Sequence, residues 1–385
     1  AATNWVFEQM QAIAATSSGN MTVQRQTFVQ PVSSRIPVPT TITNVIATLQ
    51  GTASPQRSYV VTGHLDSRVT DVLNFTSDAP GADDDASGVA VVLELARLFA
   101  TRRFSGTLVF ATVAGEEQGL YGSAYMARQM KAAGTDVQGM FSNDIVGASQ
   151  GWDGTRPDPR TLRLFVEGIP TAATPGEIAI MQSVGGENDG ATHQLARFVT
   201  DVAPFELTDM NVRVIWRRDR YLRGSDHISF QAQGYPAARF TEPRENFDHE
   251  HQDTQVVNGV QFGDLIEFVD FDYVARVTKV NGAALWALAT GPGTPKNLQI
   301  HTTPPGTLSG TNLTTLNWDP NPEPDLSGYQ VVMRETTAAD WTDALDVGNV
   351  TTITLDISKD NVQFGVRAVD QAGHRSPAAF PQAVA

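Results

Sequence analysis

The sequence of 385 residues contains no cysteine. This absence excludes disulfide bonds, thiolate metal sites, iron–sulfur clusters and cysteine nucleophiles. Any metal site in the chain must therefore be built from imidazole nitrogen and from oxygen, which histidine and acidic side chains supply. The lack of disulfides fits the cytosol, and it also fits a secreted fold that is stable without them.

Basic residues are also scarce relative to acidic ones. The chain has 27 Lys and Arg side chains against 42 Asp and Glu side chains, which gives a formal net charge of −15. Because nucleic acids and anionic membrane surfaces select basic protein faces, neither is expected as a partner. The sequence also lacks an apolar run of about eighteen residues, so we expect no transmembrane segment.

The first 290 residues alternate between strand-like and helical patterns. Apolar runs typical of buried strands occupy residues 58–62, 107–113, 139–145, 211–216 and 237–240. Helical patterns occupy residues 89–102, 123–133, 191–202 and 260–288. This alternation predicts an α/β domain over residues 1–290, with a mostly parallel central sheet flanked by helices. Ligands of such sheets bind beyond the carboxyl ends of the strands.

The composition changes near Thr290. Gly and Pro alternate through residues 290–295, as is typical of a linker. The short alternating runs that follow predict a small all-β sandwich over residues 291–385. This part resembles a fibronectin type III domain in the placement of Trp318, Tyr329 and residues 365–373. The resemblance implies a spacer or docking module without chemistry of its own.

Polar motifs fall at the ends of the predicted strands or on adjacent loops. Gly63-His64-Leu65-Asp66-Ser67 follows the first strand, and Asp83-Asp84-Asp85 opens a helix about twenty residues later. Glu116-Glu117 and Asn143-Asp144 lie at the ends of two further strands, and Ser225-Asp226-His227 precedes a short apolar run. Two imidazoles and several carboxylates are thus expected to meet at one edge of the sheet.

These residue types suit a pair of metal ions. Zinc accepts imidazole nitrogen and carboxylate oxygen, and a catalytic zinc site keeps one position open for water. Two ions about 3.5–4 Å apart need one carboxylate whose two oxygens bridge them. Two histidines and three carboxylates, one of them shared, would give each ion one histidine and two carboxylates. Divalent metals lower the pKa of such a water from 15.7 to about 7.

Glu116 and Glu117 are expected to have different roles, because neighbouring residues at a strand end project in different directions. One of them can bind metal while the other faces the substrate as a general base. Asp66 lies two residues after His64. It can accept the other ring N–H of His64 and so fix the tautomer that binds metal.

Taken in this order, the motifs resemble those of the zinc-dependent aminopeptidase family with co-catalytic metals. That family includes secreted bacterial aminopeptidases and relatives of glutamate carboxypeptidase II. The resemblance covers roughly residues 40–290 and implies the zinc exopeptidase fold of the phosphorylase/hydrolase-like class. It also implies two bound Zn²⁺ ions.

Position by position, the resemblance implies two ligand sets that share one carboxylate. The first ion would be bound by His64, Asp84 and Asp144, and the second by Asp84, Glu117 and His227. The resemblance further implies that Glu116 is the general base and Asp66 the orienting carboxylate. It also implies a cis peptide bond between Asp84 and Asp85.

Three residues are candidates for contacts with the substrate: Tyr221, Arg223 and His249. The Tyr221 hydroxyl can stabilise a tetrahedral oxyanion. Arg223 lies among other arginines, which either pair with nearby acids or bind a substrate carboxylate. In the family a similar histidine borders the substrate cleft, and His249 matches it better than His251. We expect neither of these two histidines to bind metal, because the ligand set is already complete.

The motifs and the resemblance predict a dizinc exopeptidase that hydrolyses N-terminal residues from peptide substrates, with Glu116 as general base. A carboxypeptidase or dipeptidase of the same fold is the alternative within enzymes. The alternative from another class is a non-catalytic scaffold. The chain begins with Ala1-Ala2 rather than Met, and with the resemblance this leads us to expect a secreted or periplasmic protein. Its C-terminal domain is expected to dock to a cell surface or polymer.

Overall fold

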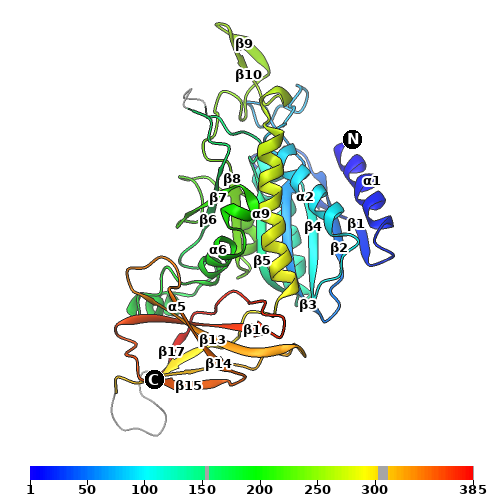
Figure 1. Cartoon of the computed structure of the whole chain (residues 1–385). Helices are drawn as coiled ribbons and strands as arrows, with labels where there is room; N and C mark the ends of the chain where they lie inside the picture. Colours follow the sequence, from blue (N-terminus) through cyan, green and yellow to red (C-terminus); the bar gives the residue numbers. More distant parts are fainter. Residues whose placement is uncertain (152–155, 302–310, 385) are drawn as a thin grey trace.

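The computed structural model describes residues 1–151, 156–301 and 311–384. An eight-stranded sheet in the order β1-β2-β4-β3-β5-β8-β6-β7 forms the frame of the larger part (Figure 1). Its strands are β1 Met21–Gln30, β2 Thr40–Leu49, β3 Ser54–His64, β4 Gly106–Val113, β5 Asp136–Asn143, β6 Thr161–Val166, β7 Asn211–Ile215 and β8 Ala237–Thr241.

The centre of this sheet is parallel. β3 pairs in parallel with β4 and β5, and β5 pairs in parallel with β8. β1, β2 and β6 run antiparallel to their inner neighbours, so the sheet is mixed towards its edges. Every residue of β4 is buried, as expected for a strand covered by helices on both faces. His64 is paired with Val113 at the ends of β3 and β4, which places the polar motifs after these strands at the same edge.

Helices cover both faces of the sheet. The α-helices of the larger part are α1 Ala2–Ala15, α2 Ala86–Phe99, α3 Glu116–Gly119, α4 Tyr121–Ala132, α5 Pro175–Ser183, α6 Ala191–Val202, α7 Phe205–Thr208, α8 His227–Gln231 and α9 Phe271–Thr290. Of these, α5 has no buried residue and lies beside the β-sandwich (Figure 1). Because side chains alternate along a strand, Tyr59 packs in a core with α1, α2, α6 and α9, whereas Val60 packs in a second core with α4 and α8. The predicted α/β class with a helix-flanked central sheet is confirmed.

The last long helix begins later than the sequence pattern indicated. The predicted helix began at residue 260, but α9 begins at Phe271, after the hairpin of β9 Gln255–Val257 and β10 Val260–Phe262 and the short helix η1 Ile266–Phe268. The Asp270 side chain accepts a hydrogen bond from the Tyr273 amide at 2.9 Å. This N-cap satisfies a free amide in the first turn and fixes the start of the helix. Among the described residues, no helix is both long and apolar enough to cross a membrane.

The C-terminal part consists of two small sheets around one core. One sheet contains β11 Gln299–His301, β12 Thr314–Asn317, β15 Thr352–Leu355 and β17 Gln382–Val384, and the other contains β13 Leu326–Glu335, β14 Asp343–Gly348 and β16 Val362–Asp370. Leu316 of the first sheet and Phe364 of the second belong to one buried cluster, so the two sheets form a β-sandwich, as predicted. Its assignment as a fibronectin type III domain stays a prediction.

The β-sandwich packs against the end of the sheet opposite to the β9–β10 hairpin (Figure 1). Arg57 at the start of β3 donates to the Gly291 carbonyl at 2.7 Å and lies 3.8 Å from the Glu323 carboxylate. Asp189 lies 2.6 Å from Arg334 of β13. The sandwich therefore contacts the amino ends of the central strands, and the carboxyl ends are left for the candidate site.

Candidate metal centre

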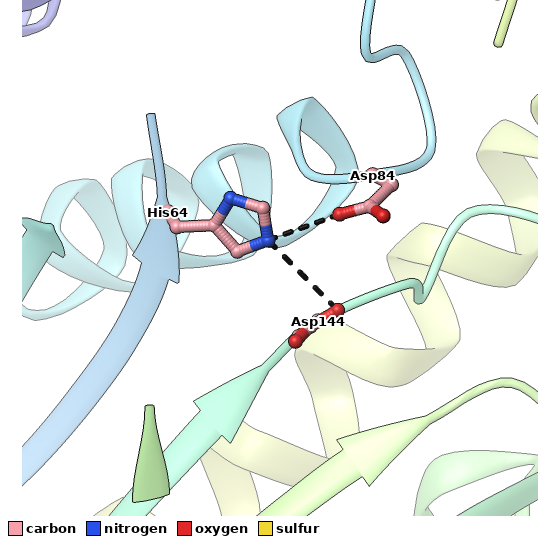
Figure 2. Close-up of side chains that lie close together, drawn as sticks. All are labelled: His64, Asp84 and Asp144. Atoms are coloured by element: carbon pink, nitrogen blue, oxygen red, sulfur yellow. Dashed lines mark ion pairs between the residues drawn. The ribbon is translucent and has the colours of Figure 1, made fainter. Parts of the chain in front are cut away.

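Three buried side chains from separate segments meet at the carboxyl edge of the sheet. His64 ends β3, Asp144 directly follows β5, and Asp84 lies in the turn before α2. The His64 Nε2 atom lies 3.0 Å from Asp84 Oδ1 and 3.9 Å from Asp144 Oδ1 (Figure 2). All three donor atoms lie within 4.8 Å of one another. The structure thus brings together the side chains that were predicted to hold the first ion.

A second group forms on the other side of Asp84. His251 Nε2 lies 2.9 Å from Asp84 Oδ2 and 3.1 Å from Glu117 Oε2. Glu250 also offers a donor atom within 4.8 Å of those of Asp84 and His251. Asp84 is the shared member of both groups, as expected of a bridging carboxylate, and Glu117 is where the sequence predicted a ligand.

The histidine of this second group differs from the predicted one. We expected His227 to bind the second ion, but its Nε2 atom donates to the Arg218 carbonyl at 2.9 Å and lies 3.6 Å from Asp219. In the described part of the chain, His227 belongs to neither cluster of potential metal ligands. Burial lowers the pKa of its imidazole, so the ring is a neutral part of the core. His251, for which no metal role was expected, lies beside Asp84 and Glu117 instead.

Arg239 connects the buried surroundings of His227 to the candidate site. Its guanidinium lies 2.9 Å from Asp144 Oδ1 and 3.1 Å from Asp219 Oδ1. The Arg239 side chain is fully buried, so both carboxylates have a fixed cationic partner. This contact orients Asp144 from behind.

Asp66 has a different role from the predicted one. His64 Nδ1 donates to the backbone carbonyl oxygen of Asp66 at 2.9 Å, whereas the Asp66 carboxylate is 4.0 Å away. That carboxylate instead accepts the backbone N–H groups of Gly115, Glu116 and Glu117 at 2.7, 3.2 and 3.1 Å. Asp66 therefore orients the His64 ring through its main chain, and its side chain holds the start of α3.

Two neighbouring carboxylates fix the backbone at Asp84. Asp264 accepts the backbone N–H groups of Asp83 and Asp84, each at 2.8 Å. Asp85 accepts the His64 N–H at 2.7 Å and the Gly88 N–H at 3.1 Å, where it caps α2. The peptide bond between Asp84 and Asp85 is cis, as the resemblance implied. Sequence reasoning gave no role to Asp264, which is distant in the chain.

Neighbouring carboxylates favour the protonated forms of the two imidazoles. Burial by itself would lower the pKa of His64, but Asp85 and Asp84 raise it well above its ordinary value. The pKa of His251 is raised to about 10, because hydrogen bonds to Asp84 and Glu117 outweigh burial. Burial also raises the pKa of Glu116 well above its ordinary value, with Asp144 adding to the shift. A carboxyl group with a raised pKa is suited to hold a proton during catalysis.

Some oxygen atoms of the two groups lack partners within the protein, and a bound metal ion would supply one. Glu117 Oε1 and Glu250 Oε2 are buried without a hydrogen-bond partner. Buried carboxylate oxygens without partners are costly, and such charges are normally paired or coordinate metals. Imidazole and carboxylate donors without thiols are a ligand set that zinc accepts.

The three predicted substrate contacts lie outside this cluster. Arg223 forms ion pairs with Glu245 and Glu250, which agrees with pairing to nearby acids rather than with a free carboxylate clamp. Tyr221 is 78% exposed, and its ring packs against Arg217 at 4.6 Å. His249 stacks on Phe268 at 3.6 Å. Their roles toward a substrate stay predictions.

Comparisons with known proteins agree with this fold and identify the family of the chain. The family model described as Peptidase family M28 matches residues 44–258. A probable zinc metalloprotease from Leptosphaeria maculans is 52% identical over 381 residues, which cover 99% of this chain and 87% of that protein.

Solved structures share the fold at lower identity. A glutaminyl cyclase from Fimbriiglobus ruber is 20% identical with a TM-score of 0.50, over 74% of this chain and 88% of that chain. The LapA aminopeptidase from Legionella pneumophila is 18% identical with a TM-score of 0.49, over 74% of this chain and 63% of that chain. The second match thus spans less than two thirds of the LapA chain.

The sequence match and the family model define a zinc-dependent peptidase. The chain belongs to peptidase family M28. The predicted enzyme class is thereby confirmed, which removes the alternative of a non-catalytic scaffold. The number of zinc ions, the peptide specificity and the cellular location of the protein are proposals.

Proposed function

We propose that the protein is a secreted aminopeptidase with two zinc ions bridged by Asp84. The observation that carries this proposal is the position of Asp84, whose two oxygens approach two different histidines. Oδ1 lies 3.0 Å from His64 Nε2, and Oδ2 lies 2.9 Å from His251 Nε2. A carboxylate held in this way would offer one oxygen to each of two adjacent metal ions.

The ligand sets follow from these contacts. One ion would be held by His64, Asp84 and Asp144. The other would be held by Asp84, Glu117 and His251, because His251 Nε2 lies 2.9 Å from Asp84 Oδ2 and 3.1 Å from Glu117 Oε2. Bound zinc supplies Lewis acidity, which polarises a carbonyl group and lowers the pKa of water. The remaining chemistry belongs to side chains that need not bind metal.

Glu116 is the proposed general base. Its backbone N–H donates to Asp66 at 3.2 Å, which fixes it beside the ligand Glu117 at the start of α3. The Glu116 carboxylate would accept a proton from the attacking water and then give it to the departing amine. Its raised pKa supports this role, because burial and neighbouring carboxylates favour the protonated form between the two transfers.

Carboxylates around the cleft support an aminopeptidase within the peptidase class. The Glu250 side chain is buried within the second group of potential ligands, and its Oε2 atom has no hydrogen-bond partner. An oxygen of this kind can accept a hydrogen bond from the positively charged α-amine of a peptide. The nearby Arg223 is paired with Glu245 and Glu250, so it is not free to bind a C-terminal carboxylate.

Matched peptides test this proposal. Zinc-loaded protein is incubated with one short peptide in free, N-acetylated and C-amidated forms, and the products are identified by mass spectrometry. We expect loss of the first residue from the free and amidated forms, and at least a hundredfold slower cleavage of the acetylated form. A carboxypeptidase would show the reverse pattern, with amidation blocking cleavage and acetylation tolerated.

A further inference from the structure

A cavity beside the metal centre differs in charge from the rest of the chain. It has a volume of about 690 Å³ and lies between the starts of α1 and β2, the middle of β1, residues 67–75 and residues 114–118. Its walls include Arg25, Arg35 and Arg68 but neither Asp nor Glu. In a chain of net charge −15, a cavity with three arginines and no acid concentrates positive potential.

The cavity borders the proposed metal ligands. Arg35 Nη1 donates to the Glu117 carbonyl oxygen at 2.8 Å. Arg68 Nε lies 3.2 Å from Glu117 Oε2, and its Nη2 lies 2.9 Å from His251 Nδ1. Gly115, which precedes Glu116, is also part of the wall. When a peptide is bound at the metal centre, one of its side chains next to the scissile bond can therefore reach this cavity.

Two of the three arginines have no acidic partner. Arg68 is committed to Glu117, but Arg25 donates only to Asn4 Oδ1 at 3.2 Å and lies over the Phe7 ring at 3.6 Å. Across residues 1–151, 156–301 and 311–384, neither Arg25 nor Arg35 forms an ion pair with a carboxylate. Arg223, which the sequence singled out, is by contrast neutralised by Glu245 and Glu250.

Apolar side chains form the rest of the wall. Ile36 is buried, whereas Val38, Leu73 and Phe75 are 63%, 45% and 89% exposed. Exposed apolar side chains lie here beside guanidinium groups that have no acidic partner. This combination suits a ligand that has a short apolar stem and a carboxylate head. Aspartate and glutamate side chains have this shape.

We propose that this cavity is a substrate subsite that binds a carboxylate of the peptide through Arg25 and Arg35. The proposal rests on the peptidase function above and adds a substrate class to it, namely peptides with an acidic residue near the scissile bond. Guanidinium groups bind carboxylates through two parallel hydrogen bonds, which gives both affinity and orientation. The α-carboxylate of a short peptide offers the same chemistry and is the second source to test.

Kinetics with isosteric peptides test the proposal. A short peptide carries Glu or Gln in turn at each of its first three positions, and each version is made with a free and an amidated C-terminus. For zinc-loaded protein we expect kcat/KM to favour Glu over Gln at least about tenfold at one position. In the double variant Arg25→Gln/Arg35→Gln the ratio should fall to about one, whereas Arg25→Lys/Arg35→Lys should keep part of it.

A matched control removes one arginine elsewhere. Arg103 is exposed and donates only to the neighbouring Arg102 carbonyl, so Arg103→Gln should keep the wild-type ratio of Glu to Gln. The reversed variant Arg25→Glu/Arg35→Glu should instead favour Lys over Gln. Circular dichroism and melting curves of each variant exclude unfolding as the cause.

The outcomes separate this proposal from the proposed function. If the double variant lowers kcat/KM by the same factor for Glu and Gln peptides, the subsite does not exist, although the protein is still a peptidase. If amidation of the C-terminus, rather than Gln, abolishes the preference, the cavity binds the terminal carboxylate and the aminopeptidase proposal fails. If no peptide is cleaved, calorimetric titration of the Glu and Gln peptides into Glu116→Gln protein measures the same preference without turnover. Equal affinities there would overturn the subsite.

Discussion

Buried charges occur in two regions of this protein, and they are arranged in opposite ways. At the contact between the central sheet and the β-sandwich, the fully buried Asp189 is bound by Arg197 at 2.9 Å and by Arg334 at 2.6 Å. At the opposite end of the sheet, Glu117 and Glu250 each keep one buried oxygen without a partner. One region is rich in arginine and the other in acid.

The difference separates a structural role from a ligand-binding one. Breaking a buried ion pair is strongly destabilising, so the Asp189 network holds the two parts of the chain together. Carboxylate oxygens without partners do not stabilise a fold, because their desolvation is not offset. Their concentration around two histidines is explained by cations that the site binds. The predictions below test the two regions separately.

The largest effect is expected for Glu116→Gln. The substitution keeps the shape and the backbone contacts of the residue but removes the proton acceptor, so kcat should fall about 10²–10⁴-fold. Zinc content, measured by atomic absorption, should stay at the wild-type level because Glu116 is not a proposed ligand. A variant with near wild-type turnover would show that another group is the general base.

A pair of histidine variants tests which imidazole serves the second ion. His251→Ala removes a proposed ligand, so the affinity for one of the two ions should fall at least about 100-fold. Loss of a residue that only hydrogen-bonds to a ligand typically lowers metal affinity by about 10–100-fold. His227→Ala should keep both ions but lower the melting temperature, because His227 is buried in the core. Competition with a chelator measures both affinities. The opposite result for the two variants would restore the sequence-based ligand set.

The domain contact should respond in stability rather than in activity. Arg334→Ala leaves the Asp189 carboxylate with Arg197 and Gln194. We expect the free energy of unfolding to fall by roughly 3 kcal/mol, the low end of the range for broken buried pairs. Arg375→Ala is the matched control at the same contact. Its pair with Asp201 is about 40% exposed on both sides and should contribute at most about 1 kcal/mol. Urea unfolding measures both values, and equal losses would contradict a structural role for the Asp189 network.

The smallest effect is a pH dependence that involves Asp226. Burial raises the pKa of this carboxyl to about 7, from an ordinary value of 3.8. The folded protein thus binds this proton more tightly than the unfolded chain, so its contribution to stability is lost as the pH rises from about 4 to 7. The test compares the free energies of unfolding of metal-depleted Asp226→Asn and metal-depleted wild type. The difference should shift in favour of the variant by on the order of 1–2 kcal/mol between pH 5 and pH 8. A pH-independent difference would show that Asp226 is not the group responsible.

The central strands and the polar motifs behind them could be predicted from the sequence, because both signals are local. Continuous apolar runs identified β3, β4, β5 and β8, and the parallel order then brought His64, Asp84 and Asp144 together. The edge strand β1 and its neighbour β2, which alternate with polar residues, were not predicted. Neither was the hairpin that delays the start of α9.

The second histidine could not be predicted, because its position depends on how a loop folds back. His251 follows the central strands by ten residues or more and has a backbone φ of 57°, a left-handed conformation that periodicity does not reveal. His227 has a stronger local signal, since it opens a helix directly after two polar residues. The resemblance drew attention to this loop, but it favoured His249 over His251, and the ligand set was already complete without either histidine.

Anomalous scattering at the zinc edge, from crystals of the zinc-loaded protein, tests the central proposal most directly. Two peaks about 3.5–4 Å apart are expected on either side of the Asp84 carboxylate, one next to His64 and Asp144 and the other next to Glu117 and His251. A single peak, or a second peak beside His227, would contradict the bridged two-metal centre.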